Sequence, residues 1–324
     1  MYPLKSILGY LSDLGRVRLG LEPKKALTTL FEVTLKCNLR CKYCYIAQET
    51  QRYPEGFSEQ ELSFSDCCKV LSQIKKSSRG LIFFGGEPFM RKDFAQLVDY
   101  AKTLGFDSID SFTNGITLME NLEIIKKLDI LYISYDSARK KQYGSIMDKV
   151  LKDAQFIKQN YNKRIMFDST LTKDDTFEEL KPFLDYVVRN KFTVFLQPLR
   201  EDSGLLDFSW FNNFMRKVKK EYENNILYNK FIKEYSLTDT KLCVPKIMLF
   251  IDSKGNLAYP CQKFISCKIG NLLENDIDLL WEEGKKKYGK FPNEKCSHCG
   301  FICWWEISYN FKNPLRLFLT HLFK

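Results

Sequence analysis

Six strand patterns alternate with helical patterns along this chain of 324 residues. We predict strands that begin near residues 29, 81, 108, 130, 164 and 193. The first helix between them has apolar residues at helical spacing, at Val70, Leu71 and Ile74. Such alternation favours a parallel α/β sheet with helices outside it and a ligand site at the carboxyl ends of the strands. Six units are too few to close an ordinary eight-stranded barrel.

Composition limits the class of protein. The chain has 11 cysteines and a net charge of +10, and it contains no run of 18 apolar residues. We therefore expect no membrane-spanning helix, no secretory signal, and a cytoplasmic protein whose cysteines serve metal or redox chemistry. No block of Lys and Arg with interleaved aromatic residues occurs, so we expect no nucleic-acid partner. With only two histidines, His298 and His321, histidine-based catalysis is disfavoured.

Three cysteines follow the first predicted strand, residues 29–36, with the spacing C-x3-C-x2-C: Cys37, Cys41 and Cys44. Three thiolates this close can hold three irons of a cubane iron–sulfur cluster and leave the fourth iron without a protein ligand. The alternatives are a zinc knuckle or a chance grouping on one loop. Zinc normally requires a fourth Cys or His nearby, and the next twenty residues contain neither.

Further motifs end the later strands: Gly85-Gly86-Glu87-Pro88, Phe112 to Gly115, and Ile133 to Asp136. Together with the cysteine spacing, they resemble the radical S-adenosylmethionine (SAM) superfamily over about residues 29–200. The resemblance implies a partial (β/α)6 TIM-like barrel that is open on one side. It also implies that SAM chelates the free iron of a 4Fe–4S cluster and is cleaved by one electron to a 5′-deoxyadenosyl radical, which abstracts hydrogen from the substrate.

The resemblance assigns roles to the first two motifs. The three cysteines would ligate the cluster, and Tyr43 would pack near the adenine of SAM. Gly85 and Gly86, which lack side chains, would let the backbone approach the methionine end of SAM. Glu87 would accept a hydrogen bond from the SAM ammonium group, and Pro88 would fix the turn.

Polar residues at the next strand ends complete the predicted SAM site. Ser134 and Asp136 match a Ser-x-Asp pattern of the family and would contact the ribose hydroxyls. Asn114 lies in a Thr-Asn-Gly turn typical of the same branch. Arg139 lies where that branch has an arginine for the SAM carboxylate, although the spacing here is shorter. Each of these residues could instead serve an ordinary turn or helix cap.

A second cysteine group follows residue 240. Cys243 and Cys261 flank a predicted hairpin turn at Gly255, and Cys296, Cys299 and Cys303 follow a helical segment. The group resembles the SPASM and Twitch extensions of radical SAM enzymes and implies one auxiliary 4Fe–4S cluster. The preferred ligands are Cys243, Cys261, Cys296 and Cys299, with Cys303 competing for one place. The alternative is a structural zinc ion.

We predict four segments: an amphipathic N-terminal segment (1–28), the barrel (29–235), a small cysteine-rich SPASM/Twitch-like module (236–310) and an amphipathic basic tail (311–324). The first segment carries a helical stripe of Leu4, Ile7, Leu8, Leu11 and Leu14. An amphipathic end segment can pack on the barrel or contact a membrane surface peripherally.

Two enzyme functions are compatible with these features. The first is modification of a peptide or protein. The second is radical modification of a lipid, sugar or other small molecule at the membrane surface. A third hypothesis is a non-catalytic zinc-binding module. For either enzyme we expect an electron donor such as flavodoxin or ferredoxin. The residues predicted to line the barrel mouth are Gln197, Arg200, Glu201 and Asp202.

Overall fold

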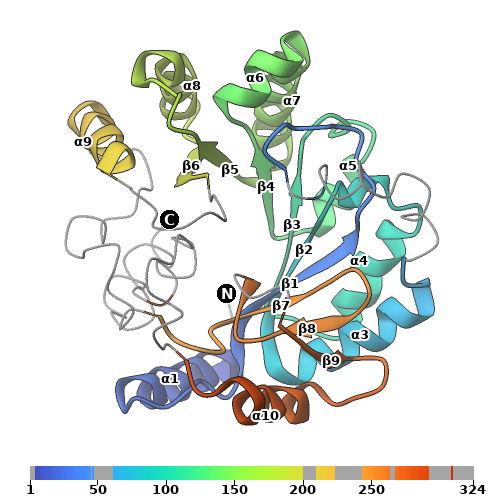
Figure 1. The fold of residues 1–324 in the computed structure, drawn as a ribbon. Helices are drawn as coiled ribbons and strands as arrows, with labels where there is room; N and C mark the ends of the chain where they lie inside the picture. Colours follow the sequence, from blue (N-terminus) through green and yellow to red (C-terminus); the bar gives the residue numbers. More distant parts are fainter. Residues whose placement is uncertain are drawn as a thin grey trace.

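The structure, a computed structural model, describes residues 4–44, 46, 61–199, 209–222, 243–262, 267–291 and 308, with side chains from residue 8 onward. Its centre is one nine-stranded sheet (Figure 1). The strands are β1 (Ala26–Thr34), β2 (Ser78–Gly85), β3 (Ser108–Thr113), β4 (Ile130–Ser134), β5 (Arg164–Leu171), β6 (Thr193–Pro198), β7 (Met248–Ile251), β8 (Asn256–Ala258) and β9 (Lys268–Asn271). They pair in the order β6-β5-β4-β3-β2-β1-β7-β8-β9.

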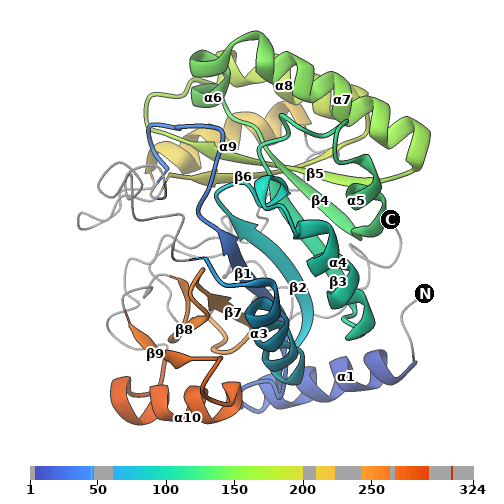
Figure 2. The ribbon, with the colours of Figure 1, turned by 90° about the vertical axis from the view of Figure 1, so that its right-hand side faces the viewer.

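The first six strands are parallel and are joined by helices that follow the outer side of the curved sheet (Figures 1 and 2). This confirms the predicted α/β partial barrel. The helices are α3 (Phe64–Ser77), α4 (Phe94–Thr103), α5 (Leu122–Lys127), α6 (Ser137–Tyr143), α7 (Ser145–Tyr161) and α8 (Phe177–Arg189). A further helix, α9 (Ser209–Tyr222), packs beside α8.

Four strands begin at the predicted residues, whereas β1 and β2 each begin three residues earlier than predicted, at Ala26 and Ser78. The two earlier starts have the same cause: Ala26 and Ser78 pair with each other, so the two strands begin at the same level of the sheet. Ser78 is also the C-cap of α3, so the strand follows the helix without a loop. The polar pair Ser78 and Arg79 therefore belongs to a strand even though its composition is typical of a turn.

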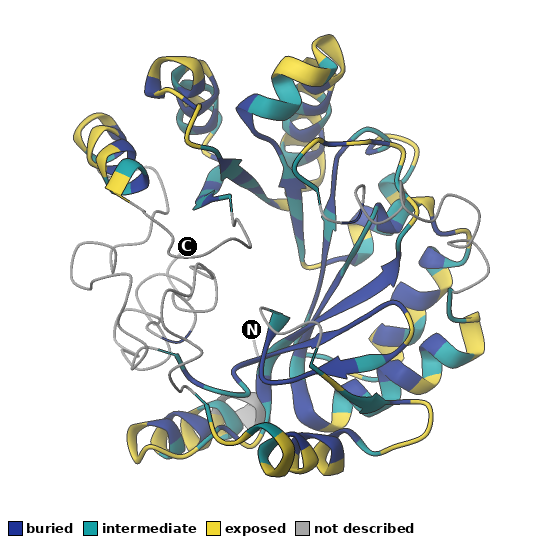
Figure 3. Ribbon diagram, viewed as in Figure 1, coloured by how far each residue is buried: buried dark blue, intermediate teal, exposed yellow. Residues whose placement is uncertain are grey.

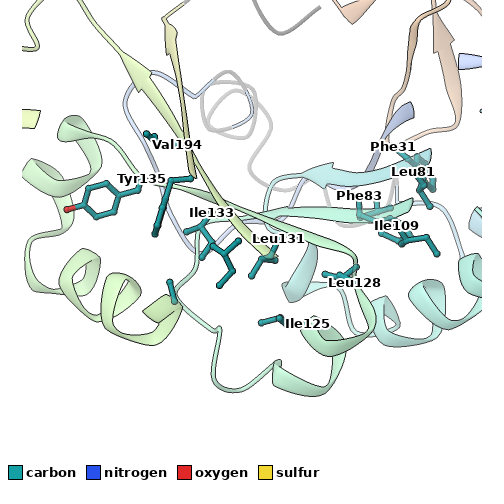
Figure 4. Close-up of a cluster of buried hydrophobic side chains, with 14 of the residues drawn as sticks. Phe31, Leu81, Phe83, Ile109, Ile125, Leu128, Leu131, Ile133, Tyr135 and Val194 are labelled. Carbon is teal, nitrogen blue, oxygen red and sulfur yellow. The ribbon is translucent and has the colours of Figure 1, made fainter. Parts of the chain in front are cut away.

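Alternation along the strands separates two apolar layers. Side chains such as Phe31, Phe83 and Ile133 face the helices and form the larger cluster (Figure 4). Leu30, Ile82 and the residues at alternate positions face the inside of the barrel. The strands are mostly buried and the outward faces of the helices are exposed (Figure 3).

The segment from Cys243 onward extends the same sheet. Strand β7 pairs with β1 in parallel, with Thr28 opposite Met248, and β8 and β9 follow antiparallel. The predicted hairpin turn is confirmed between β7 and β8, where Gly255 has φ +83°. The helix α10 (Ile277–Tyr288) closes this part. The predicted domain boundaries at residues 235/236 and 310/311 lie outside the described residues.

The helix α1 (Leu4–Arg18) packs differently from the predicted stripe. Leu14 and Val17 are buried against the inner cluster, but Leu8 and Leu11 are 59% and 53% exposed. The buried face is set by Asp13, whose carboxylate binds Arg79 of β2 at 2.5 Å and accepts from the Lys24 amide at 2.7 Å. This ion pair turns α1 so that only part of its apolar stripe meets the barrel. Among the described residues, no helix is long and apolar enough to cross a membrane.

We predict that replacing Asp13 by Ala lowers the free energy of unfolding by about 3 kcal/mol, because it leaves the largely buried Arg79 without its counterion. Urea denaturation measures the change. The control is Asp66→Ala, since Asp66 pairs with Lys69 on the surface, where such pairs contribute about 0.5 kcal/mol. Equal losses in the two variants would contradict a special role for the Asp13–Arg79 pair.

Candidate active site

The loop that follows β1 carries all three cysteines of the first motif. Cys41 is buried, and Cys37 and Cys44 are partly exposed. The amide of Cys44 donates to the carbonyl of Cys41 at 3.0 Å, and the amide of Leu39 donates to the sulfur of Cys37 at 3.4 Å. Burial raises the pKa of the Cys37 thiol, while the Leu39 amide opposes the shift. The loop thus forms a compact turn at the carboxyl end of β1.

Two residues of helix α6 form hydrogen bonds to this loop. The Tyr143 hydroxyl accepts from the Arg40 amide at 2.8 Å, and the Gln142 side chain donates to the Arg40 carbonyl at 2.9 Å. The Arg40 guanidinium donates to the carbonyl of Cys37 at 2.6 Å. Neither Gln142 nor Tyr143 was found by sequence reasoning, because each acts only through a residue about a hundred positions away.

The backbone after β2 lies directly against the cysteine loop. The amide of Gly86 donates to the carbonyl of Thr34 at 2.8 Å, and the amide of Glu87 donates to that of Lys36 at 2.7 Å. A Cβ atom at Gly86 would lie 2.2 Å from the Lys36 carbonyl oxygen. Gly85, with φ +139°, is equally close to Thr34. Only glycine fits both positions. Pro88 then begins a 3-10 turn, η1 (Pro88–Met90).

Glu87 is completely buried and joins the ends of two strands. Its carboxylate accepts from the Thr113 hydroxyl at 2.9 Å, from the Asn114 amide at 2.7 Å and from the Phe89 amide at 3.3 Å. Burial raises the pKa of Glu87 to about 7, and these three donors partly oppose the shift. Glu87 therefore organises the turn after β3, and its predicted contact with the SAM ammonium group stays a prediction.

Asn114 extends this turn to the cysteine loop. Its amide group donates to the Asn38 side chain at 2.7 Å and lies 3.8 Å from the sulfur of Cys37. Its own carbonyl oxygen accepts from the Ile116 amide at 3.0 Å. The predicted site residue Asn114 thus lies beside the cysteine motif, and it also serves the turn, as the alternative interpretation proposed.

The Ser-x-Asp pattern lies at the end of β4. Ser134 is partly exposed, and Asp136 is fully buried as the N-cap of α6, where it accepts from the Arg139 amide at 2.8 Å. The Tyr43 hydroxyl donates to the same carboxylate. Arg139 donates through Nε to the sulfur of Cys41 at 3.4 Å. Burial raises the pKa of Asp136, although Arg139 and Tyr43 oppose it.

A carboxylate that sequence reasoning missed lies nearby on the inner face. Asp168 of β5 receives two hydrogen bonds from the Gln197 side chain, at 3.0 and 3.1 Å. Burial raises the pKa of Asp168 to about 7, while Arg139 opposes the shift. Its signal in the sequence is a single acidic residue in an alternating strand pattern. Gln197 lies at the predicted barrel mouth. The other predicted mouth residues, Arg200, Glu201 and Asp202, lie outside the described residues.

Cys243 and Cys261 lie at the open end of the β7–β8 hairpin. Both pack against the inner apolar cluster. Strand β7 runs parallel to β1, so this end of the hairpin lies at the opposite end of β1 from Cys37. Cys296, Cys299 and Cys303 lie outside the described residues. Within the described ranges, no three His, Cys, Asp or Glu side chains converge closely enough to hold one metal ion.

Residues 31–187 match the radical SAM superfamily. The chain is 25% identical to 7,8-dihydro-6-hydroxymethylpterin dimethyltransferase of Methanocaldococcus jannaschii, over 83% of this chain and 60% of that protein. It is 24% identical to the S-adenosylmethionine-dependent nucleotide dehydratase of Flammeovirga pacifica, over 82% and 93% of the two chains. The chain thus spans less than two thirds of the first relative and nearly all of the second.

The fold resembles that of Streptococcus suis SuiB bound to S-adenosylmethionine, with a TM-score of 0.66 over 92% of this chain and 75% of SuiB. Sequence identity with SuiB is 17%, so this likeness establishes the fold alone. The matched residues form a radical SAM superfamily domain within the partial barrel, and this family uses a 4Fe–4S cluster and SAM.

We predict that Gly86→Ala lowers the free energy of unfolding by about 3 kcal/mol, because the new methyl group would collide with the Lys36 carbonyl, and overpacking typically costs 1–3 kcal/mol or more. Urea denaturation measures the change. The control is Gly15→Ala in α1, where nothing lies within 4 Å of the new Cβ atom; there we expect a small gain. A neutral effect at Gly86 would disprove the close approach.

We also predict that Asp168→Asn weakens the pH dependence of stability. The folded-state pKa of Asp168, about 7, lies above its usual value of 3.8. The folded protein therefore holds a proton that the unfolded chain has released between about pH 4 and 7, so stability falls as the pH rises through this window. Urea denaturation at pH 5 and pH 8 should show a smaller loss in the variant. The control is Asp66→Asn, a change at a surface carboxylate paired with Lys69. An unchanged loss for Asp168→Asn would contradict the prediction.

Proposed function

We propose that this radical SAM enzyme removes a hydrogen atom from a peptide or protein, and that Cys37, Cys41 and Cys44 hold its 4Fe–4S cluster. When bound, the cluster and SAM supply one-electron cleavage of SAM to methionine and a 5′-deoxyadenosyl group that takes the hydrogen atom. The chain's own residues position these groups and exclude water from them.

The cysteine loop fits a cluster of several irons. Each thiolate of a cubane binds its own iron, so the three sulfurs need not converge on one point. Donors already lie at two of the sulfurs, from Leu39 and Asn114 at Cys37 and from Arg139 at Cys41. Such hydrogen bonds compensate the charge of metal-bound thiolates. The donor set supports the cluster better than a zinc site, which would need a fourth ligand.

The neighbouring strand ends suit the SAM position that the motifs predict. Gly85 and Gly86 present bare backbone beside the cysteine loop. Ser134 lies at the carboxyl end of β4, and Asp136 and Tyr43 follow on the same side of the sheet. We propose that SAM lies between these groups, with its methionine end toward the glycines and its adenosine toward Tyr43 and Ser134.

We further propose one auxiliary 4Fe–4S cluster whose ligands are Cys243, Cys261, Cys296 and Cys299, with Cys303 competing for one place. The first two cysteines lie at one end of the hairpin and share one apolar cluster, which supports a common site. An auxiliary cluster there would lie at the far end of β1 from the SAM site. It would be placed to exchange an electron with a substrate held inside the barrel.

The observation that carries the peptide proposal is the charge of the inner face. No Lys or Arg occurs in the carboxyl-terminal halves of β1 to β6, where the side chains facing inward include Glu32 and Asp168 and the aromatic residues Phe84, Phe112 and Tyr132. A nucleotide triphosphate requires cationic partners for its phosphates. The described inner face therefore favours an uncharged or cationic group, such as a peptide side chain.

The fold likeness supports the same choice. SuiB has also been described bound to the precursor peptide SuiA, with a TM-score of 0.64 to this chain. Two relatives, a pterin dimethyltransferase and a nucleotide dehydratase, act on small molecules according to their names. A small-molecule substrate is therefore the alternative. A lipid substrate would suit the exposed Leu8 and Leu11 of α1, next to the basic Arg16 and Arg18. Binding of the protein to anionic vesicles would favour that alternative.

We predict that anaerobic reconstitution loads about eight irons per chain, as two four-iron clusters, and that dithionite and SAM then yield 5′-deoxyadenosine. The triple variant C37A/C41A/C44A should hold about half the iron and form no 5′-deoxyadenosine, because the SAM cluster is lost. Cys68→Ala, a change at a cysteine on α3 away from the motif, is the control and should match the wild type. Zinc in place of iron at the loop would refute the proposal.

The substrate class is tested with the loaded enzyme and three probes: short peptides encoded beside the gene, GTP, and anionic lipid vesicles. A peptide substrate should accelerate 5′-deoxyadenosine formation several-fold and change in mass. Acceleration by GTP or by lipid alone, with every peptide unchanged, would overturn the peptide assignment and leave the radical SAM activity intact.

A further inference from the structure

We propose that Arg139 raises the reduction potential of the loop cluster through its contact with Cys41, an inference that rests on the proposed binding of a 4Fe–4S cluster by Cys37, Cys41 and Cys44. The family resemblance predicts a different role for Arg139, as a ligand of the SAM carboxylate. In the structure, its Nε atom is directed at the sulfur of Cys41.

The contact is short and shielded. Nε of Arg139 lies 3.4 Å from Sγ of Cys41, and residue Cys41 is 6% exposed. The Arg139 side chain itself is 16% exposed. Little water can therefore screen the guanidinium charge at this sulfur, so its effect is larger than that of a surface charge.

Three contacts hold Arg139 in place. The backbone amide of Arg139 donates to the Asp136 carboxylate at 2.8 Å, and its guanidinium Nη1 lies 3.5 Å from the same carboxylate. The guanidinium lies over the Tyr43 ring, 5.7 Å from its centre, and the Tyr43 hydroxyl also donates to Asp136. Arg139 is therefore a positioning residue fixed on the first turn of α6, between the SAM side of the site and the cysteine loop.

Arg139 is a charged donor, whereas the other donors described at these sulfurs are neutral. The Leu39 amide and the Asn114 side chain, both at Cys37, are neutral. The Tyr143 hydroxyl near Cys41 is neutral as well. Reduction adds one negative charge to a cluster, and a positive charge with a hydrogen bond at a ligand thiolate stabilises the reduced form. Loss of Arg139 would also leave the buried Asp136 carboxylate without its counterion.

The experiment measures the midpoint potential of the loop cluster by redox titration monitored by EPR, without SAM, so that a role of Arg139 toward the SAM carboxylate does not contribute. The loop signal is identified as the one absent from C37A/C41A/C44A. We compare wild type, R139Q, R139K and K141Q. Lys141→Gln removes one positive charge from the same helix, at a side chain that pairs with Glu179 and is 57% exposed.

We expect R139Q to lower the equilibrium constant for reduction at least tenfold, which is 59 mV for one electron. R139K, which keeps the charge and loses the Nε–H donor, should fall between R139Q and wild type, and K141Q should match the wild type. Equal potentials in wild type and R139Q, or equal shifts in R139Q and K141Q, would overturn the proposal.

The iron content separates the two levels of inference. Absence of a loop cluster in the wild type would refute the proposed function itself. If R139Q is the one variant that fails to load iron, the midpoint potential of the loop cluster in R139K becomes the test. A potential below that of K141Q would support the role of Arg139. A potential equal to that of wild type would overturn it.

Discussion

The close approach of two backbones at the carboxyl ends of β1 and β2 determines the geometry of the whole candidate site. Gly86 and Glu87 donate to the carbonyls of Thr34 and Lys36, so the chain after β2 is hydrogen-bonded to the chain that becomes the cysteine loop. A side chain at Gly85 or Gly86 would separate them. Because the loop cannot move away from β2, everything that contacts β2, including the turn after β3, is fixed relative to the cysteines.

Buried carboxylates carry this constraint across the sheet. Glu87 connects the end of β2 to the turn after β3, and Asp136 connects α6 to Tyr43 and Arg139. Each accepts several hydrogen bonds, which offsets the cost of burying its charge. The same donors explain why motif residues can look structural and functional at once. A residue that holds a strand end in place also defines where a cofactor can lie beside it.

Much of the barrel could be predicted from the sequence because each strand from β3 to β6 has a regular apolar pattern of its own. The start of β2 could not, since Ser78 and Arg79 become a strand through contacts with distant residues: Ser78 pairs with Ala26 of β1, and the Arg79 carbonyl accepts from the Asp107 amide. The parallel addition of β7 to β1 depends on a contact between residues more than 200 positions apart. The cysteine and glycine motifs were visible because their spacing is local. Asp168, Gln142 and Tyr143 were missed because their partners are distant in the sequence.

The position of the two cysteine groups constrains how the barrel can work. Strand β1 pairs with β2 on one side and β7 on the other, so one strand connects the loop at its carboxyl end to Cys243 and Cys261 near its amino end. The inner face between them is lined by aromatic rings, among them Phe112 and Tyr132, stacked with their centres 4.9 Å apart. In the proposed arrangement, a substrate on this face would lie between the SAM side of the barrel and the other end of β1. Any auxiliary cluster at the other end would contact the substrate from the opposite side, which suits removal of a hydrogen atom at one end and of an electron at the other.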